Sequence, residues 1–277
     1  MARKLISYLL RASGLLRLSD TVKYRMQAAS MRTGNRAFLR EHPGVPVPPP
    51  YLVYESYALD YRGYYYDGLD TAKFVLATLG RHKEMKGVSL LDWGCGPARV
   101  VRHMPGLLAG KECAVSGSDY NRESIAWCKT NIPGVAFSLN GSEPPLDYPD
   151  ATHDAIYGIS VLTHLSPAQH GQWVRELNRV LRPGGIAFLS THGSRFRFNL
   201  MPWEVRAFDN GELVARGNAK EGHRTYTSFQ PAAFMEKLAG DAGFRVLEHR
   251  EGGPGSEEFT QDVWILKKSA APAGNPG

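Results

Sequence analysis

From Val88 onward, short apolar runs typical of strands alternate with stretches whose apolar residues recur at helical spacing. This alternation predicts a parallel sheet covered by helices on both faces. Helices are predicted after Pro97 and over 121–131. The predicted strands are VSLLDW (88–93), CAVSGSD (113–119), GVAFSL (134–139), DAIYGIS (154–160) and IAFLSTH (186–192).

The clearest predicted helix follows the fourth strand. Ser166 can cap its N-terminus, and Pro167 suits the first helical position, where no backbone N–H is needed. The Pro-Gly-Gly sequence at 183–185 ends the helix. Its apolar residues form one stripe: Trp173, Val174, Leu177, Val180 and Leu181.

Beyond the fifth strand the chain contains an insertion, a helix and two last strands. Residues 193–228 are rich in loop-forming residues, and 231–243 predict a helix. Residues 245–250 and 262–268 predict two strands joined by a short loop, so they can pair antiparallel. The whole is predicted to be one doubly wound α/β domain with a mostly parallel seven-stranded sheet and a C-terminal antiparallel hairpin.

The first 50 residues are predicted to be a helical arm that ends in a stiff linker, because the prolines between Pro43 and Pro50 favour extended backbone. Helical spacing recurs over 69–79. We place the domain at 51–268 and expect the tail, 269–277, to be disordered. The apolar residues of the arm that have helical spacing are Leu5, Ile6, Leu9 and Leu10.

Positive charge is concentrated in this arm. Residues 1–40 hold nine of the 33 Lys and Arg residues and the single acid Asp20, so they carry +8, whereas the rest carries −2 of the overall +6. A basic catalytic face, and with it a nucleic-acid partner, is therefore not expected. The arm is either an amphipathic helix that contacts an anionic membrane or a partner, or a helix packed on its own domain.

Hydrophobicity and cysteine content indicate in which cellular compartment the protein is expected. No stretch reaches the roughly eighteen apolar residues of a membrane span, and no convincing cleavage site follows the arm. The three cysteines, Cys95, Cys113 and Cys128, are odd in number and do not form a disulfide framework. We expect a soluble cytoplasmic protein whose arm could contact the inner face of the membrane.

The central chemical signal is LLDWGCGP (90–97), where the first strand turns into a helix. Glycines there let the backbone approach a ligand, and a helix N-terminus offers unpaired N–H groups. Twenty-five residues after Gly94, Asp119 ends the second strand, where a carboxylate can accept hydrogen bonds from both ribose hydroxyls. Asp119 could instead cap a helix, a role that Asn121 can fill.

LLDWGCGPARV, SGSDYN, DATHDAIY and RVLRPGG resemble the successive motifs of class I S-adenosylmethionine-dependent methyltransferases, over about 69–268. The resemblance implies a Rossmann-like fold, S-adenosyl-L-methionine as cofactor, and an acceptor lid over 194–228. Asp92 would help to hold the methionine end of the cofactor, Asp119 its ribose and Tyr120 its adenine. The other implied cofactor contacts are Gly94, Cys95, Gly96, Asn140, Gly141, Ser142 and Ser160, although many members have an acid among residues 140–142.

Two other classes stay open. A nicotinamide-dependent oxidoreductase shares the Gly94-x-Gly96 turn, but Arg99 replaces the third glycine, and Asp92 would repel a diphosphate while attracting a methionine ammonium. A non-catalytic, methyltransferase-like binding module would keep the same motifs.

Methyl transfer depends on alignment and requires no metal, but a hydroxyl acceptor also needs a base. His164 after the fourth strand and His192 at the end of the fifth are the candidates; each could instead hold the shape of its loop. The GISVL sequence after the fourth strand lacks the motif of DNA amino methylation and the acids of a magnesium-assisted enzyme. The resemblance favours O-methylation of a small-molecule, glycan-type or lipid-linked acceptor.

Overall fold

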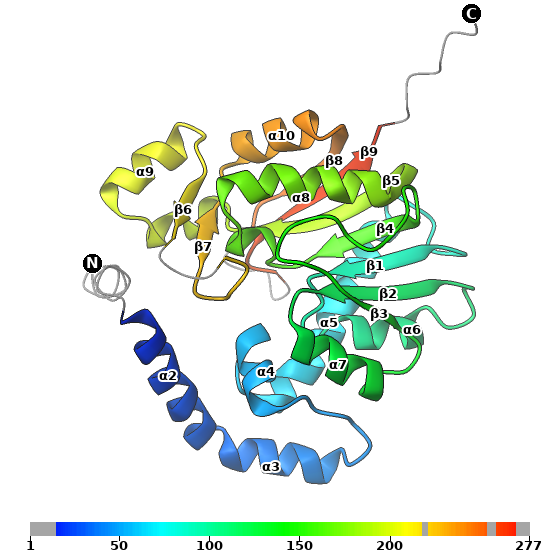
Figure 1. Cartoon of the computed structure of the whole chain (residues 1–277), viewed down its shortest axis with the longest axis vertical. Coiled ribbons are helices and arrows are strands. Elements are labelled where there is room, and N and C mark those ends of the chain that lie inside the picture. Colours follow the sequence, from blue (N-terminus) through cyan, green and yellow to red (C-terminus); the bar gives the residue numbers. More distant parts are fainter. Residues whose placement is uncertain (1–14, 218–220, 254–258, 270–277) are drawn as a thin grey trace, which may run out of the picture.

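The computed structural model describes residues 15–217, 221–253 and 259–269. They form a twisted sheet between helices, with a helical N-terminal segment curving along one side (Figure 1). The main sheet has seven strands in the order β3-β2-β1-β4-β5-β9-β8. They are β1 (Ser89–Trp93), β2 (Ala114–Asp119), β3 (Ala136–Leu139), β4 (His153–Gly158), β5 (Leu181–Thr191), β8 (Phe244–Arg250) and β9 (Asp262–Lys268).

This topology confirms the predicted Rossmann-like, mostly parallel sheet with its terminal hairpin. Strands β3, β2, β1, β4 and β5 pair in parallel, whereas β9 is antiparallel to both β5 and β8. The chain runs outward from β1 in one direction through β2 and β3, and in the other through β4 and β5. Such a reversal opens a crevice at the carboxyl ends of the central strands, where ligands bind in α/β proteins.

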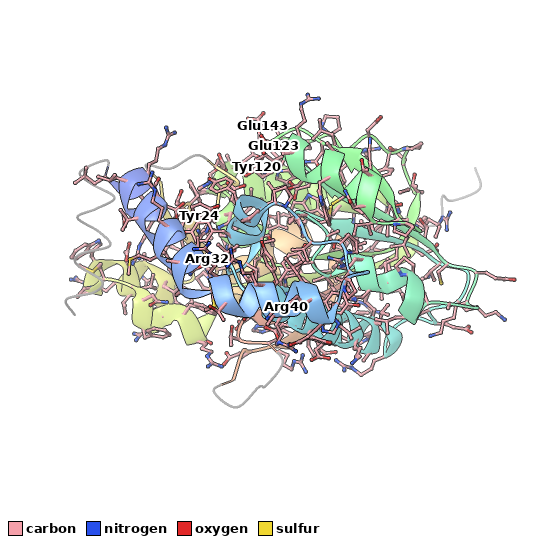
Figure 2. The ribbon with its side chains drawn as sticks, turned by 90° about the horizontal axis from the view of Figure 1, so that it is seen from below. Tyr24, Arg32, Arg40, Tyr120, Glu123 and Glu143 are labelled. Atoms are coloured by element: carbon pink, nitrogen blue, oxygen red, sulfur yellow. The ribbon has the colours of Figure 1, made fainter. Side chains whose placement is uncertain are left out.

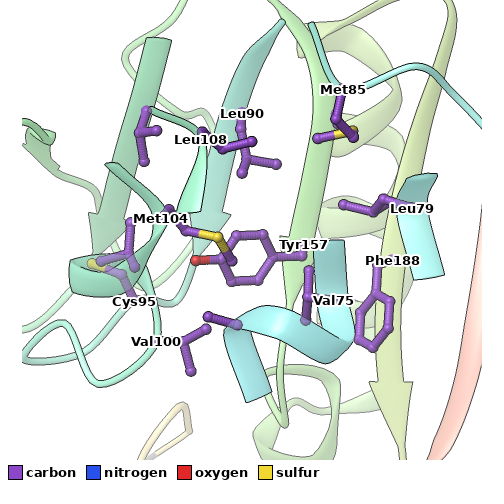
Figure 3. Packing of buried hydrophobic residues seen from close by; sticks show 14 of the residues in the cluster. Val75, Leu79, Met85, Leu90, Cys95, Val100, Met104, Leu108, Tyr157 and Phe188 are labelled. Atoms are coloured by element: carbon purple, nitrogen blue, oxygen red, sulfur yellow. The ribbon is translucent and has the colours of Figure 1, made fainter. Parts of the chain in front are cut away.

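Alternating side chains of the strands pack against two helical layers. Leu90 faces α5, α6 and α7 in one cluster, whereas its neighbour Leu91 faces α8 and α10 in the other (Figure 3 shows the first). The described α-helices are α2 (Leu16–Ser30), α3 (Arg32–Glu41), α4 (Pro50–Ser56), α5 (Tyr61–Gly80), α6 (Met104–Leu107), α7 (Arg122–Asn131), α8 (Pro167–Val180), α9 (Pro202–Asp209) and α10 (Ala232–Asp241).

Local sequence signals explain several boundaries. The Ser166 side chain accepts a hydrogen bond from the backbone N–H of Gln169 at the start of α8, as predicted. The helix expected after Pro97 is only a 3₁₀ turn, η1 (Val101–His103), and the single turn α6. Pro105 removes a backbone donor there and Gly106 favours the unfolded chain, so a longer helix does not form.

The segment at 193–228 is more structured than its loop-rich sequence predicts. It contains η3 (Ser194–Asn199), α9 and a two-stranded antiparallel sheet of β6 (Val214–Arg216) and β7 (Thr227–Phe229). A small apolar cluster holds these elements together: Leu200, Phe208, Val214 and Phe229.

The N-terminal helices do not stand apart from the domain. In α3, Phe38 is fully buried in a cluster with residues of α4 and α5, and the Asn35 side chain donates to the Leu59 carbonyl and accepts from the Tyr61 N–H. Helix α2 has no fully buried residue, but its Tyr24 packs against the same cluster, so packing on the domain describes both helices. The sequence also placed the start of the helix at 69–79 too late, because α5 begins at Tyr61.

We expect Asn35→Ala to lower the free energy of unfolding by about 1–3 kcal/mol, because it leaves one buried donor and one buried acceptor without partners. Arg36→Ala, a change of an exposed residue on the same helix, should alter it by no more than about 0.5 kcal/mol. Urea denaturation of both variants measures the difference. Equal stabilities would mean that these hydrogen bonds do not anchor α3.

Candidate functional site

A cavity of about 1000 Å³ opens at the carboxyl ends of β1, β2 and β4. Its volume lies at the upper end of the range of small-molecule sites, about 300–1000 Å³. The structure brings to this cavity all ten residues that the sequence assigns to the cofactor: Asp92, Gly94, Cys95, Gly96, Asp119, Tyr120, Asn140, Gly141, Ser142 and Ser160.

The glycine turn after β1 has a geometry that other residues would not tolerate. Gly94 has φ +76°, and a Cβ built there would lie 2.4 Å from Cγ2 of Val161. Both conditions demand glycine. The N–H groups of Gly94 and Cys95 donate to the Ser118 carbonyl at the end of β2. The turn therefore holds bare backbone against the cavity.

Asp119 joins this turn to the end of β2. Its Oδ2 accepts from the Gly96 N–H at 2.8 Å, and its Oδ1 accepts from the Asn121 N–H at 2.7 Å. Asn121 caps α7 with its own side chain, so Asp119 is not needed as the cap. Burial raises the pKa of Asp119, partly offset by these backbone donors. Each carboxylate oxygen keeps a further lone pair for a ribose hydroxyl.

Asp92 lies at the base of the cavity. Burial raises its pKa to about 8, and the charge of Asp119 contributes in the same direction. A carboxylate that is largely protonated near neutral pH would be ionised by a cation placed beside it. This residue therefore suits the positively charged methionine end of S-adenosylmethionine.

The raised pKa of Asp92 has a measurable consequence. Between about pH 4 and pH 8 the folded chain retains a proton that the unfolded chain releases, so Asp92 makes stability fall as pH rises through this window. Asp92→Asn should therefore raise the unfolding free energy at pH 8 by several kcal/mol, at most about 5, because each pH unit of this window contributes about 1.4 kcal/mol, with little change at pH 4. Thermal unfolding at both pH values tests this, and a variant less stable than the parent at pH 8 would contradict it. Asp70→Asn, which changes an exposed acid, is the control.

Tyr120 links the cofactor motif to the insertion. Its hydroxyl donates to the Gly222 carbonyl at 3.2 Å, and the Gly222 N–H donates to the His164 carbonyl at 2.9 Å. Gly222, His223 and Arg224 all line the cavity. This end of the insertion therefore reaches the site, whereas its role as an acceptor lid stays a prediction.

His164 lines the cavity, in the 3₁₀ turn η2 (Leu162–His164) after β4. Its Nδ1 lies 2.7 Å from the Tyr226 carbonyl oxygen. Since a carbonyl only accepts, Nδ1 carries the proton and Nε2 keeps its lone pair. Burial lowers the pKa of His164, so the imidazole is neutral at pH 7. The tautomer and the charge state are those of a general base.

His192 is not brought to the cavity, contrary to the expectation from its place at the end of β5. Its Nδ1 bonds to the Ser228 carbonyl at 3.0 Å, and its ring lies between Phe196 and Phe229. Burial lowers its pKa to about 4. These contacts give His192 a structural place between β5 and the insertion.

Two groups of lining residues were missed by the sequence reasoning. Glu55 of α4 and His223 face each other at 3.3 Å, although 168 positions separate them. Gln261 accepts hydrogen bonds from the hydroxyls of Ser160 and Ser190 and so fixes the end of β4. Neither pairing leaves a local sequence signal.

Side chains of the insertion differ in whether they reach the cavity. Arg224 reaches the cavity, where it also contacts Asp20 of α2 at 3.1 Å. Arg197 instead forms an exposed ion pair with Asp209, and the half-exposed Trp203 does not line the cavity. In 15–217, 221–253 and 259–269 no group of three or more His, Cys, Asp or Glu is placed to hold a metal ion.

Comparisons with known proteins agree with this geometry. Residues 90–185 match the family described as a methyltransferase domain. The chain contains a class I S-adenosylmethionine-dependent methyltransferase domain. A probable S-adenosylmethionine-dependent methyltransferase of Mycolicibacterium smegmatis is 32% identical over 134 residues, 46% of this chain and 49% of the relative. A tRNA N(3)-cytidine methyltransferase of Gallus gallus is 23% identical over 197 residues, 67% and 52% of the two chains.

Solved structures support the fold of the methyltransferase domain. The structure of an S-adenosylmethionine-dependent methyltransferase from Mesorhizobium loti has a TM-score of 0.54 at 15% identity, covering 71% of this chain and 97% of that one. At such identity only the fold is shared. The chain spans about half the length of these two curated relatives. Within residues 15–217, 221–253 and 259–269, no helix is long and apolar enough to cross a bilayer.

Proposed function

We propose that this chain is a methyltransferase that transfers the methyl group of S-adenosylmethionine to a hydroxyl oxygen of a small-molecule, glycan-type or lipid-linked acceptor. The observation that carries the proposal is the position of the His164 imidazole beside the cofactor residues, with its Nδ1 proton held by the Tyr226 carbonyl. Nε2 makes no hydrogen bond within the described part of the chain.

When bound, S-adenosylmethionine supplies a methyl group on a sulfonium, which makes that carbon electrophilic. Asp119 would hold the ribose and Asp92 would lie beside the positively charged methionine end, so these two acids would set the position of the cofactor. His164 Nε2 takes the proton of the acceptor hydroxyl as the oxygen approaches, and the Tyr226 carbonyl stabilises the resulting imidazolium. Gln261 holds Ser160 at the adjoining edge of the cavity.

The relatives support methyl transfer as a class but do not favour one acceptor, since one of them is a tRNA methyltransferase. The charge distribution of the chain argues against a nucleic-acid acceptor. The described cations on the cavity wall are matched by acids there, and residues 41–277 carry −2 overall. The cavity suits a compact acceptor better than a polynucleotide.

The test is labelled methyl transfer. The purified protein is incubated with methyl-labelled S-adenosylmethionine and with separated RNA, protein, water-soluble and solvent-extracted fractions of cells. We expect label in a water-soluble or solvent-extracted compound, with the methyl group stable to alkali if it is an ether. Label in RNA or protein would contradict the proposed acceptor.

Calorimetry with S-adenosylhomocysteine and NADH separates the remaining classes. A methyltransferase should bind S-adenosylhomocysteine and give no heat with NADH. Binding of S-adenosylhomocysteine without transfer to any fraction would favour the non-catalytic binding module, and NADH binding alone would favour an oxidoreductase.

A further inference from the structure

Helix α2 presents an apolar stripe to solvent. Leu15, Leu18, Val22 and Met26 recur every three to four residues, which places them on one face, and they are 49%, 62%, 49% and 68% exposed. In a helix that packs on a soluble domain this face would normally be the buried one. Figure 2 looks onto α2 and α3, with Tyr24, Arg32 and Arg40 labelled along them.

The inward face of α2 packs Tyr24 against the domain and also makes polar contacts that fix the orientation of the helix. Asp20 accepts from the Tyr54 hydroxyl at 2.8 Å and pairs with Arg224 at 3.1 Å. Gln27 Oε1 accepts from the Leu59 N–H at 3.1 Å. These contacts hold this face of α2 against the domain, so the apolar stripe on the other side faces outward.

Exposed cations surround the stripe. At 100° per residue, Lys23 and Arg25 lie on either side of it. The two acids of α2 and α3 are both paired, Asp20 with Arg224 and Glu41 with Arg62. The exposed positive residues of the two helices are Arg17, Lys23, Arg25, Arg32, Arg36 and Arg40.

We propose that α2 docks on an anionic lipid bilayer, with its apolar stripe in the boundary between headgroups and acyl chains and its flanking cations against the lipid charges. The charge selects this occupant. A second copy of the chain would bring six further cations against these six, whereas an anionic surface neutralises them.

Docking in this orientation would also bring the rim of the cavity near the bilayer. Asp20 accepts a hydrogen bond from Arg224, which lies on the rim of the cavity, and another from Tyr54 of α4. Two other residues of α4, Leu52 and Glu55, line the cavity directly. The rim would therefore lie close to the bilayer, which suits a lipid-linked acceptor. This consequence rests on the proposed function, whereas the docking itself does not.

The experiment is co-sedimentation of the full chain with phosphatidylglycerol-containing vesicles and with phosphatidylcholine vesicles, at low and high salt. The parent should bind the anionic vesicles and lose affinity at high salt. Leu18→Ser/Val22→Ser/Met26→Ser should weaken binding at least about tenfold, and Lys23→Gln/Arg25→Gln about 10- to 30-fold. Lys111→Gln/Lys129→Gln, which neutralises two exposed lysines outside these helices, should change it less than about twofold.

All variants should bind S-adenosylhomocysteine like the parent, which shows that they are folded and separates this proposal from the proposed function. A parent chain that ignores anionic vesicles at low salt would overturn the docking. So would a stripe variant that binds like the parent. Light scattering that shows a dimer broken by the stripe variant would assign the stripe to a second copy and overturn it as well.

Discussion

Replacing Asp119 with Ala should weaken S-adenosylhomocysteine binding by about 2–3 kcal/mol, which is roughly 30- to 150-fold. The carboxylate is buried at the end of β2, faces the cavity and has lone pairs left for two ribose hydroxyls. Two charge-assisted hydrogen bonds would be lost together. Calorimetry with S-adenosylhomocysteine measures the effect.

The variant also loses the bonds from Asp119 to the Gly96 and Asn121 N–H groups, so its folding must be checked by thermal unfolding. Asp70→Ala removes another acid at the cavity, one that pairs with Lys73 and belongs to no cofactor motif. It should leave affinity within about twofold. A folded Asp119→Ala protein with the affinity of the parent would refute the ribose assignment.

Local signals made the sheet and its cofactor edge predictable. Short apolar runs predict the strands, and a cap such as Ser166 or a glycine such as Gly94 marks where a helix begins or a strand ends. The parallel topology then brings Asp92 and Asp119 to one edge of the sheet. Motifs separated by 27 positions could therefore be assigned to one cavity.

Contacts between distant segments could not be read in the same way. Helical spacing predicts that the N-terminal segment is helical, but it does not reveal that Asn35 bonds to Leu59 and Tyr61 or that Asp20 meets Arg224. These partners become neighbours only when the chain folds. For the same reason the sequence of the insertion predicts mainly loops, although this segment forms α9 and the β6–β7 pair.

His164 and His192 show this limit within the site. Both follow parallel strands, and both donate Nδ1–H to a carbonyl of the returning insertion, Tyr226 for one and Ser228 for the other. What separates them is the direction of the chain after the strand. After β4 the chain places His164 on the wall of the cavity, whereas after β5 it places His192 against Phe196 and outside the cavity.

That difference makes the two histidines a matched pair for a test of the base. His164→Gln should lower kcat about 10²- to 10⁴-fold and leave cofactor affinity nearly unchanged, because glutamine roughly keeps the size and hydrogen bonding of the imidazole but cannot take the proton. His192→Gln, which changes a residue with the same carbonyl bond outside the cavity, should retain near-normal turnover.

The pH profile separates a base from a residue that holds the loop. Burial lowers the pKa of His164 below its usual 6.5, so the parent should have constant turnover above about pH 7 and lose it only as the imidazole becomes protonated at lower pH. His164→Gln should lose this acid limb as well as the rate. If His164→Gln kept near-normal turnover across about pH 6–9, His164 would hold the Tyr226 loop in place, and alignment of the acceptor with the methyl group would have to account for the reaction.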